Sequence, residues 1–394
     1  MQLVINPGSA SKKYSLYEDG VALLSARFEK THEGFESTLT HESALQHEQI
    51  SEEEYFSSLE KMLFWCRDLG LIKEHEQISV VGVRIVASGS FFMEHRLIDD
   101  GYVNALRDAC PYAPLHITST LQEIEKVQEL LPETPVFGIS DSEFHKTLPP
   151  EARTYAINPQ DAEDYDVWRF GYHGLSVESV LKKAETLLGE SRRTIVCHLG
   201  GGMSITAVLD GKSIETSMGF APASGLPMSA RVGDMDAEAL LTLMQRKNLS
   251  PEEARLYVST QAGYKALTGG VGDMRDLLHL YELGDEKALL AIHILQHSIK
   301  KFIGSYVAIL GGLDSLILTA TTNERNAPAR QLFFGNLEYL GIVIDEEKNK
   351  LLEESVDGLI SSEQGVKIAV ISTDEMGNIA TIAQSLYLSA RQGL

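Results

Sequence analysis

A strand–loop–strand pattern occurs twice in this chain of 394 residues, which leaves few folds open to it. In each copy an apolar strand enters a glycine-containing loop, a second strand follows, and an Asp-Gly turn closes the segment. The copies span residues 2–20 and 194–211. An Asp-Gly pair between apolar strands favours a tight hairpin. The repeat therefore indicates a duplicated domain, and we expect two similar halves whose glycine loops face a cleft.

Strands and helices alternate through the rest of the chain, which predicts the α/β class. Further strands are predicted at 78–86, 135–139, 316–319 and 366–372. Helical spacing of apolar residues predicts helices at 52–69, 119–131 and 285–310, and a last helix reaching about residue 391. Because no low-complexity linker separates the halves, residues 141–150 are predicted to be a hinge.

Composition excludes several classes of protein. The chain has 34 Lys and Arg against 56 Asp and Glu, a formal charge of −22, so a nucleic-acid partner is not expected. Its three cysteines, Cys66, Cys110 and Cys197, fit neither a disulfide framework nor a zinc site. No apolar run approaches the ~20 residues that span a bilayer. We expect a cytoplasmic protein without a membrane partner.

Compact catalytic signatures such as the Walker A, GxSxG and HExxH motifs do not occur. The remaining candidates are glycine-rich turns after strands, where exposed N–H groups bind anions, together with Arg, His and Asp near strand ends. The stretch 215–236 carries Arg231 and has few helix-forming or strand-forming residues. Long ordered loops of this kind are usually functional.

A series of longer motifs carries a resemblance to a known family. The motifs are GVRIV with Arg84, APLH with His116, SDSEFHKTLP with Asp141, RFGYHGLS with His173, CHLGGGMSI with His198, ETSMGF through Arg231, GDMRD from Gly272, and ISTDE with Glu375. Their order and spacing resemble those of the acetate and propionate kinases, in the actin-like (ASKHA) phosphotransferase superfamily. The resemblance implies two actin-like, ribonuclease H-like domains. These are 1–145 with 377–394, and 146–376 on the nucleotide side.

The resemblance also implies roles for individual residues. The implied catalytic residues are Arg84, His116, Asp141, His173 and Arg231, and the implied metal-side residues are Asn6 and Glu375. Arg84, Val86, Leu115, Tyr172 and Pro222 fall at the acid pocket. The nucleotide side falls on Ser9, Ser11, Lys13, His198, Gly200, Gly201, Gly202, Asp273, Met274, Arg275, Thr321, Thr322, Asn323 and Glu324.

Phosphoryl transfer to a carboxylate makes chemical sense of that set. The reaction needs charge neutralisation and in-line positioning, which arginines, a histidine donor and Mg²⁺ or Mn²⁺ supply. A carboxylic acid with a pKa near ~4 is already ionised, so no general base is required. Structural interpretations stay open: Arg84 in a structural ion pair, His116 and His198 as core or turn histidines, Asp141 as a turn cap, Glu375 as a first-turn helix acid.

The chain departs from the family's pattern mainly on the donor side. The family usually has the turn AGIGEN, whereas residues 320–324 here are Ala-Thr-Thr-Asn-Glu. Replacing glycines by Thr321 and Asn323 adds side chains where the backbone approaches the nucleotide. Gly201 stands where the family has asparagine, and Tyr172 replaces the usual phenylalanine, so its hydroxyl needs a partner if it is buried.

The resulting hypothesis is a homodimeric, Mg²⁺-dependent kinase that reversibly transfers phosphoryl between ATP and acetate or a similar short-chain acid, giving ADP and an acyl phosphate. Two alternatives stay open. In the first, the same chemistry uses pyrophosphate or another non-adenosine donor, which the altered turn favours and the retained Asp273 and Arg275 oppose. In the second, the protein is an inactive sensor, which the retained polar site residues oppose.

Overall fold

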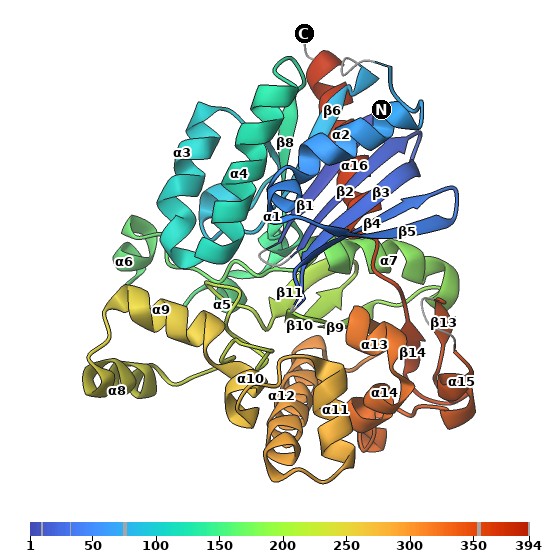
Figure 1. The fold of residues 1–394 in the computed structure, drawn as a ribbon. Coiled ribbons are helices and arrows are strands. Elements are labelled where there is room, and N and C mark those ends of the chain that lie inside the picture. Colours follow the sequence, from blue (N-terminus) through green and yellow to red (C-terminus); the bar gives the residue numbers. More distant parts are fainter. Residues whose placement is uncertain (9–10, 32, 74–76, 353–355, 393–394) are drawn as a thin grey trace. The chain divides into compact units, whose positions relative to one another are not determined.

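The computed structural model describes residues 1–8, 11–31, 33–73, 77–352 and 356–392 (Figure 1). The chain divides into two compact units. Unit 1 comprises Met1–Glu143 and Asp374–Leu394, and unit 2 comprises Phe144–Thr373. Within the described residues, no helix is long and apolar enough to cross a membrane.

Unit 1 is built on one mixed sheet. In spatial order its strands are β5 (Ala44–Ile50), β4 (Phe35–His41), β3 (Val21–Lys30), β2 (Ser11–Glu18), β1 (Gln2–Pro7), β6 (Val80–Ile85), β8 (Val136–Ser140) and β7 (Arg96–Leu97). Its α-helices are α1 (Glu52–Phe56), α2 (Ser58–Asp68), α3 (Asp100–Ala109), α4 (Pro114–Leu130) and α16 (Glu375–Gln392). Strands β1, β6 and β8 run parallel, and the β1–β2 and β2–β3 pairs are antiparallel.

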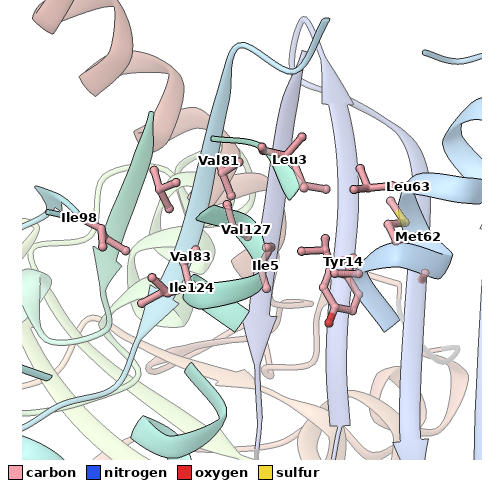
Figure 2. Packing of buried hydrophobic residues seen from close by; sticks show 14 of the residues in the cluster. Leu3, Ile5, Tyr14, Met62, Leu63, Val81, Val83, Ile98, Ile124 and Val127 are labelled. Atoms are coloured by element: carbon pink, nitrogen blue, oxygen red, sulfur yellow. The ribbon is translucent and has the colours of Figure 1, made fainter. Parts of the chain in front are cut away.

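Helices cover both faces of this sheet because its strands are apolar on both sides. Val81 and Val83 of β6 belong to the same buried cluster as Ile124 and Val127 of α4 (Figure 2). Successive strand residues point to opposite faces, so Gly82 faces the other layer. A Cβ atom there would lie 2.9 Å from the Ile379 side chain, so glycine lets α16 approach the sheet closely.

Unit 2 has a second mixed sheet. In spatial order its strands are β11 (Lys212–Thr216), β10 (Met203–Leu209), β9 (Arg193–Leu199), β12 (Ser315–Thr319), β14 (Lys367–Val370) and β13 (Gly358–Leu359). Its α-helices are α5 (Pro150–Arg153), α6 (Pro159–Asp164), α7 (Gly174–Leu188), α8 (Ala237–Lys247), α9 (Pro251–Thr260), α10 (Gly263–Thr268), α11 (Met274–Glu282), α12 (Glu286–Leu310), α13 (Thr321–Arg325), α14 (Ala327–Phe334) and α15 (Glu346–Leu351). Helix α7 packs its buried valines against β9, β10, β12 and the residues around β14.

The two sheets share one topology, which confirms the predicted α/β fold and its duplication. The order β3-β2-β1-β6-β8 in unit 1 corresponds to β11-β10-β9-β12-β14 in unit 2, with the same strand directions. Both predicted hairpin turns form. Asp19 and Gly20 have φ values of 49° and 79°, and Asp210 and Gly211 have φ values of 48° and 78°. Two consecutive positive φ angles match the right-handed twist of the flanking strands.

Two predicted helices differ from the structure. The helix expected over 52–69 is broken at Ser57 into α1 and α2, and the break lets the buried Ser58 hydroxyl reach the Tyr14 hydroxyl at 2.7 Å. The helix expected from residue 119 starts at Pro114, because proline is well placed in a first helical turn. His116 therefore lies inside α4, in its first turn.

Candidate functional site

In unit 1, three of the predicted site residues gather around the guanidinium of a fourth, Arg84. Asn6 lies near the end of β1, Arg84 near the end of β6, Asp141 directly after β8, and Glu375 begins α16. Arg84 Nη2 lies 2.9 Å from Asp141 Oδ1, and Arg84 Nη1 lies 3.0 Å from Glu375 Oε2. Asn6 Nδ2 donates to Glu375 Oε2 at 3.2 Å. Parallel strands end at one edge of the sheet, where α/β proteins place ligands.

The two carboxylates stabilise the charge of this partly buried arginine. Burial alone would lower the pKa of Arg84, but the charges of Asp141 and Glu375 outweigh it, and the pKa is raised. Arg84 thus sits in the ion pairs that its structural interpretation predicted, and Glu375 is a first-turn helix acid. Neither contact removes a chemical role, because a guanidinium has five N–H donors.

The neighbouring Lys13 in β2 carries a second cation in this region. Burial is the largest influence and lowers its pKa, while Glu375 acts in the opposite direction. A partly desolvated ammonium binds an arriving anion more strongly than one in water. Ser11 also lies in β2, whereas the predicted site residue Ser9 lies outside the described residues.

The donor atoms in this cluster suit a hard cation. Among the described residues, no three His, Cys, Asp or Glu side chains form a metal cluster. The side-chain oxygens of Asn6 and Glu375 are nevertheless ligands that Mg²⁺ accepts, since it usually binds one or two carboxylates and keeps several waters. The residues present therefore fit a sparsely liganded Mg²⁺ better than an all-protein cage.

Helix α4 carries His116 in its first turn and contacts Gly8 through a neighbouring residue. The Ser119 hydroxyl, one turn further along, donates to the Gly8 carbonyl at 3.3 Å. A buried ion pair holds α4 against β2, with Lys12 Nζ 2.8 Å from Glu123 Oε1. The predicted pocket residue Val86 is buried directly after β6. Leu115 is placed in α4, but its side chain lies outside the described part of the chain.

In unit 2, His173 and His198 lie face to face. Their ring centroids are 4.1 Å apart and their planes are inclined by 26°. The Nδ1 atom of His173 lies 3.0 Å from the Ser204 hydroxyl, and Nδ1 of His198 lies 2.8 Å from the Ser176 hydroxyl. These serine contacts fix the orientation of both rings.

A left-handed turn aims the His173 ring. His173 has φ 62° and Gly171 has φ 76°, conformations that L-residues with side chains rarely adopt. The ring of His145 lies directly against Gly171, where a Cβ atom would be 2.6 Å from it. His145 Nε2 also lies 2.9 Å from the Tyr172 carbonyl oxygen, and its Nδ1 lies 2.9 Å from the Ser213 hydroxyl.

His145 is the support that sequence reasoning missed, although it lies within the motif SDSEFHKTLP. Complete burial lowers its pKa to about 4, so the ring is neutral near pH 7. A neutral imidazole has one donor and one acceptor nitrogen, which matches its carbonyl and hydroxyl partners. Only the packing around Gly171 distinguishes this structural histidine from a catalytic one.

The glycine loop 200–202 passes close to His173 and Arg231. A Cβ atom on Gly202 would lie 2.8 Å from His173 Nε2 and 3.6 Å from Arg231 Nη1. Arg231 is oriented by the Pro222 carbonyl, which accepts from Nη1 at 3.0 Å. In contrast, a Cβ atom on Gly201 would meet nothing within 4 Å. An imidazole, a guanidinium and a glycine backbone thus converge, as an anion site requires.

Tyr172 has the hydrogen-bond partner that its burial demands. It is fully buried, and its hydroxyl donates to the Phe220 carbonyl at 2.7 Å. This bond uses the hydroxyl's only proton. We therefore do not expect the tyrosine to select a more polar acid by donating to it.

The altered turn at 320–324 has a different inner packing from the one we expected. The Asn323 side chain is fully buried, and its Nδ2 donates to the Cys197 carbonyl at 2.8 Å and to the Thr319 carbonyl at 3.1 Å. The Asn323 amide thus donates to buried carbonyl groups, and the expectation that Thr321 and Asn323 add side chains at the nucleotide stays a prediction. Thr322 is also buried, and Thr321 is exposed.

Backbone strain marks the start of the same turn. Ala320 has φ 68° and ψ 169°, a region that is essentially restricted to glycine. Glu324 holds this conformation, since its Oε1 accepts from the Ala320 N–H at 2.8 Å and from the Thr373 N–H at 3.0 Å. Such strain persists only where the surroundings fix it, and it concentrates at functional sites.

The remaining predicted nucleotide residues start α11. The Asp273 side chain caps the helix, and the Arg275 side chain is 85% exposed and lies 2.8 Å from Asp273 through Nη2. Met274 is buried beneath them. The pair fixes an exposed guanidinium that is available to a ligand.

Two units share one topology; one carries Asn6, Arg84 and Asp141 at its strand ends, and the other brings His173 and Arg231 to a glycine loop, as in the phosphotransferases of the actin-like class. A family model described as the acetokinase family matches residues 1–381, so the chain belongs to the acetokinase family. It is an enzyme of the acetate kinase type, which phosphorylates a carboxylate, and ATP and ADP are the family's co-substrates.

Individual relatives agree with this assignment. The acetate kinase of Acetivibrio thermocellus is 35% identical over 393 residues, covering 96% of this chain and 97% of the relative. The crystal structure of Porphyromonas gingivalis acetate kinase is 30% identical with a TM-score of 0.84, covering 98% of this chain and 99% of that one. A propionate kinase structure from Francisella tularensis is 31% identical with a TM-score of 0.86 at the same coverage.

Proposed function

We propose that the chain catalyses reversible, Mg²⁺-dependent phosphoryl transfer between ATP and acetate. The observation that carries the proposal is the convergence of His173, Arg231 and the 200–202 loop. Developing charge on a transferring phosphoryl group is stabilised by fixed N–H donors and guanidinium groups. These groups are held in place by serine, carbonyl and glycine contacts, so little reorganisation is needed during the reaction.

The cluster around Arg84 supports a role at the acid. A guanidinium fork fits the two oxygens of a carboxylate, and Arg84 is fixed in orientation by Asp141 and Glu375. Asp141 accepts from Arg84 and is therefore an orienting residue and not a base. Acetate is already ionised at neutral pH, so the acceptor loses no proton. His116 is proposed as a further donor near the reacting groups.

Asn6 and Glu375 are proposed to hold Mg²⁺, directly or through water. A bound divalent cation neutralises charge on the donor's phosphate oxygens. Arg84 Nη1 and Asn6 Nδ2 both donate to Glu375 Oε2, so an ion bound through Oε2 would share that oxygen with the guanidinium.

We propose ATP and not pyrophosphate as the donor, because the Asn323 side chain of the substituted turn is buried in the protein interior. The buried Asn323 takes no space on the ligand side, and Asp273 and Arg275 remain available for an adenosine. Thr321 is exposed and is the added side chain that still favours a compact donor. We propose acetate before propionate only because it is the smaller of the two acids.

We infer that units 1 and 2 are the two predicted actin-like domains, and that the protein is a homodimer. Helix α8 supports the homodimer, because none of its residues is buried in the single chain and its apolar Leu241 is 55% exposed. The cytoplasmic location stays a prediction, with Cys66, Cys110 and Cys197 all free.

The direct test is phosphoryl transfer to acetate with Mg²⁺, with the acyl phosphate trapped as its hydroxamate. ATP and pyrophosphate are compared as donors, and acetate and propionate as acceptors. Turnover with ATP and acetate supports the proposal. Turnover with pyrophosphate alone transfers the assignment to a non-adenosine donor. No turnover with either, but binding of ADP, indicates a sensor.

A further inference from the structure

Arg330 in α14 is a charged side chain that the proposed chemistry does not use. It is 1% exposed and is among the largest fully buried side chains of the protein. Its Nε donates to Asn349 Oδ1 at 2.6 Å, Nη2 donates to the Asn349 carbonyl at 2.9 Å, and Nη1 donates to the Asn323 carbonyl at 2.6 Å. No carboxylate among the described residues forms an ion pair with it.

Such an arrangement is costly unless the charge has a use. Burial lowers the pKa of Arg330, yet a guanidinium remains protonated in proteins. Carbonyl dipoles offset part of its desolvation, but an apolar side chain of similar volume would fill the same space without it. Hydrogen bonding alone therefore does not account for a cation at this position.

The location of Arg330 points to the donor turn. Its Nη1 contacts the carbonyl of Asn323, the residue whose side chain binds the Cys197 carbonyl. Cys197 lies in β9, the strand that leads into the 200–202 loop. One guanidinium thus touches the 320–324 turn directly and reaches the strand before the glycine loop through a single residue.

We propose that Arg330 is a positioning residue for the phosphate donor, which fixes the 320–324 turn and places a buried positive charge behind it. This inference rests on the proposed function and deepens it. The charge is not cancelled by a neighbouring carboxylate in the described structure, so its field extends to anions at the turn. At ~10 Å and an effective dielectric constant of ~20, one such charge alters the affinity for one opposite charge about tenfold.

The inference predicts that charge and fork geometry have separable effects. Arg330→Gln removes the charge and retains an N–H donor, whereas Arg330→Lys retains the charge and loses the fork. We expect KM for ATP to rise about tenfold or more in Arg330→Gln and by less than about threefold in Arg330→Lys. KM for acetate should stay within about twofold in both, although both variants lose thermal stability.

A second pair of variants leaves Arg330 in place. Asn349→Asp gives the guanidinium a carboxylate partner, and Asn349→Leu is an uncharged control of similar size that also removes the Oδ1 acceptor of Arg330 Nε. Both lose the bond from Asn349 Nδ2 to the Ala327 carbonyl, which is 3.0 Å long. KM for ATP should be several-fold higher in Asn349→Asp than in Asn349→Leu, because only the aspartate cancels the charge of Arg330.

The outcomes separate this inference from the proposed function. If the unaltered protein forms no hydroxamate with ATP, the proposed function fails, and ADP binding by calorimetry then replaces KM for the same variants. If the protein is active but the Gln and Lys variants have equal KM for ATP, the charge has no role at the donor. Equal effects of Asn349→Asp and Asn349→Leu would overturn the inference in the same way, even if neither Arg330 variant folds.

Discussion

Adding a single methyl group at Gly202 should disable the enzyme without unfolding it. A Cβ atom there would lie 2.8 Å from His173 Nε2 and 3.0 Å from its Cε1. Ordinary contact begins near 3.4 Å, so the imidazole must move by about 0.6 Å. A displacement of about 1 Å in a positioned catalytic group can cost about a hundredfold in rate. For the smaller shift here we expect kcat of Gly202→Ala to fall about tenfold or more.

Gly201→Ala is the matched control, because a Cβ atom on Gly201 meets nothing within 4 Å. The assay is the hydroxamate rate with saturating ATP and acetate, with thermal unfolding measured on the same samples. Gly201→Ala should retain near-normal kcat, and both variants should melt within a few degrees of the parent. A Gly202→Ala variant with kcat within threefold of the control would show that His173 Nε2 does not contact the transferring group.

Further predictions follow from the same unit. Arg231→Leu should abolish transfer with an unchanged circular dichroism spectrum; an active, folded variant contradicts its role. Gly171→Ala should lower the free energy of unfolding by about 2–5 kcal/mol, through left-handed strain and contact with His145, and a urea titration showing less than 1 kcal/mol refutes this. Tyr172→Phe should cost about 1 kcal/mol and leave the acetate-to-propionate preference unchanged, whereas a shifted preference would implicate the hydroxyl. As the pH falls from 6.5 to about 4, His145 becomes protonated in the unfolded chain but stays neutral in the folded protein. Stability should therefore fall by up to about 3 kcal/mol as pH decreases, and a His145→Asn variant with the same acid sensitivity would disprove this cause.

Local signals in the sequence predicted most of the fold. The Asp-Gly turns formed as hairpins because a short pair of residues fixes both positive φ angles. The long helix predicted over 285–310 corresponds to α12, Glu286–Leu310, since an amphipathic pattern of that length is unambiguous. Two copies of the pattern of strand, glycine loop, strand and Asp-Gly turn were sufficient to indicate duplication.

Features that depend on distant partners were not predictable in the same way. Next to the break at Ser57, the Ser58 hydroxyl contacts the Tyr14 hydroxyl of β2, and the Asn323 amide donates to carbonyl groups of β9 and β12. Glycine-to-asparagine substitution looks like added bulk in a sequence, because the pattern does not reveal buried acceptors. Arg330 likewise resembles any surface arginine of an amphipathic helix until its burial is known.

The candidate site was predicted in its residue types and only partly in its contacts. The resemblance gave Asn6, Arg84, Asp141 and Glu375 as separate positions, and the structure joins them by hydrogen bonds and ion pairs. His145 had no signal beyond its place in a motif, since buried and catalytic histidines are indistinguishable in sequence.

The discontinuity of unit 1 has a consequence for its biosynthesis. Helix α16 is translated only after the whole of unit 2, yet it covers the face of β6 on which Gly82 lies and contributes Glu375. During translation, unit 1 therefore has one apolar sheet face uncovered until α16 has been synthesised. Arg84 meanwhile lacks one of its two carboxylate partners. Chains interrupted late in translation should be both inactive and dependent on chaperones, since exposed apolar sheet faces promote aggregation.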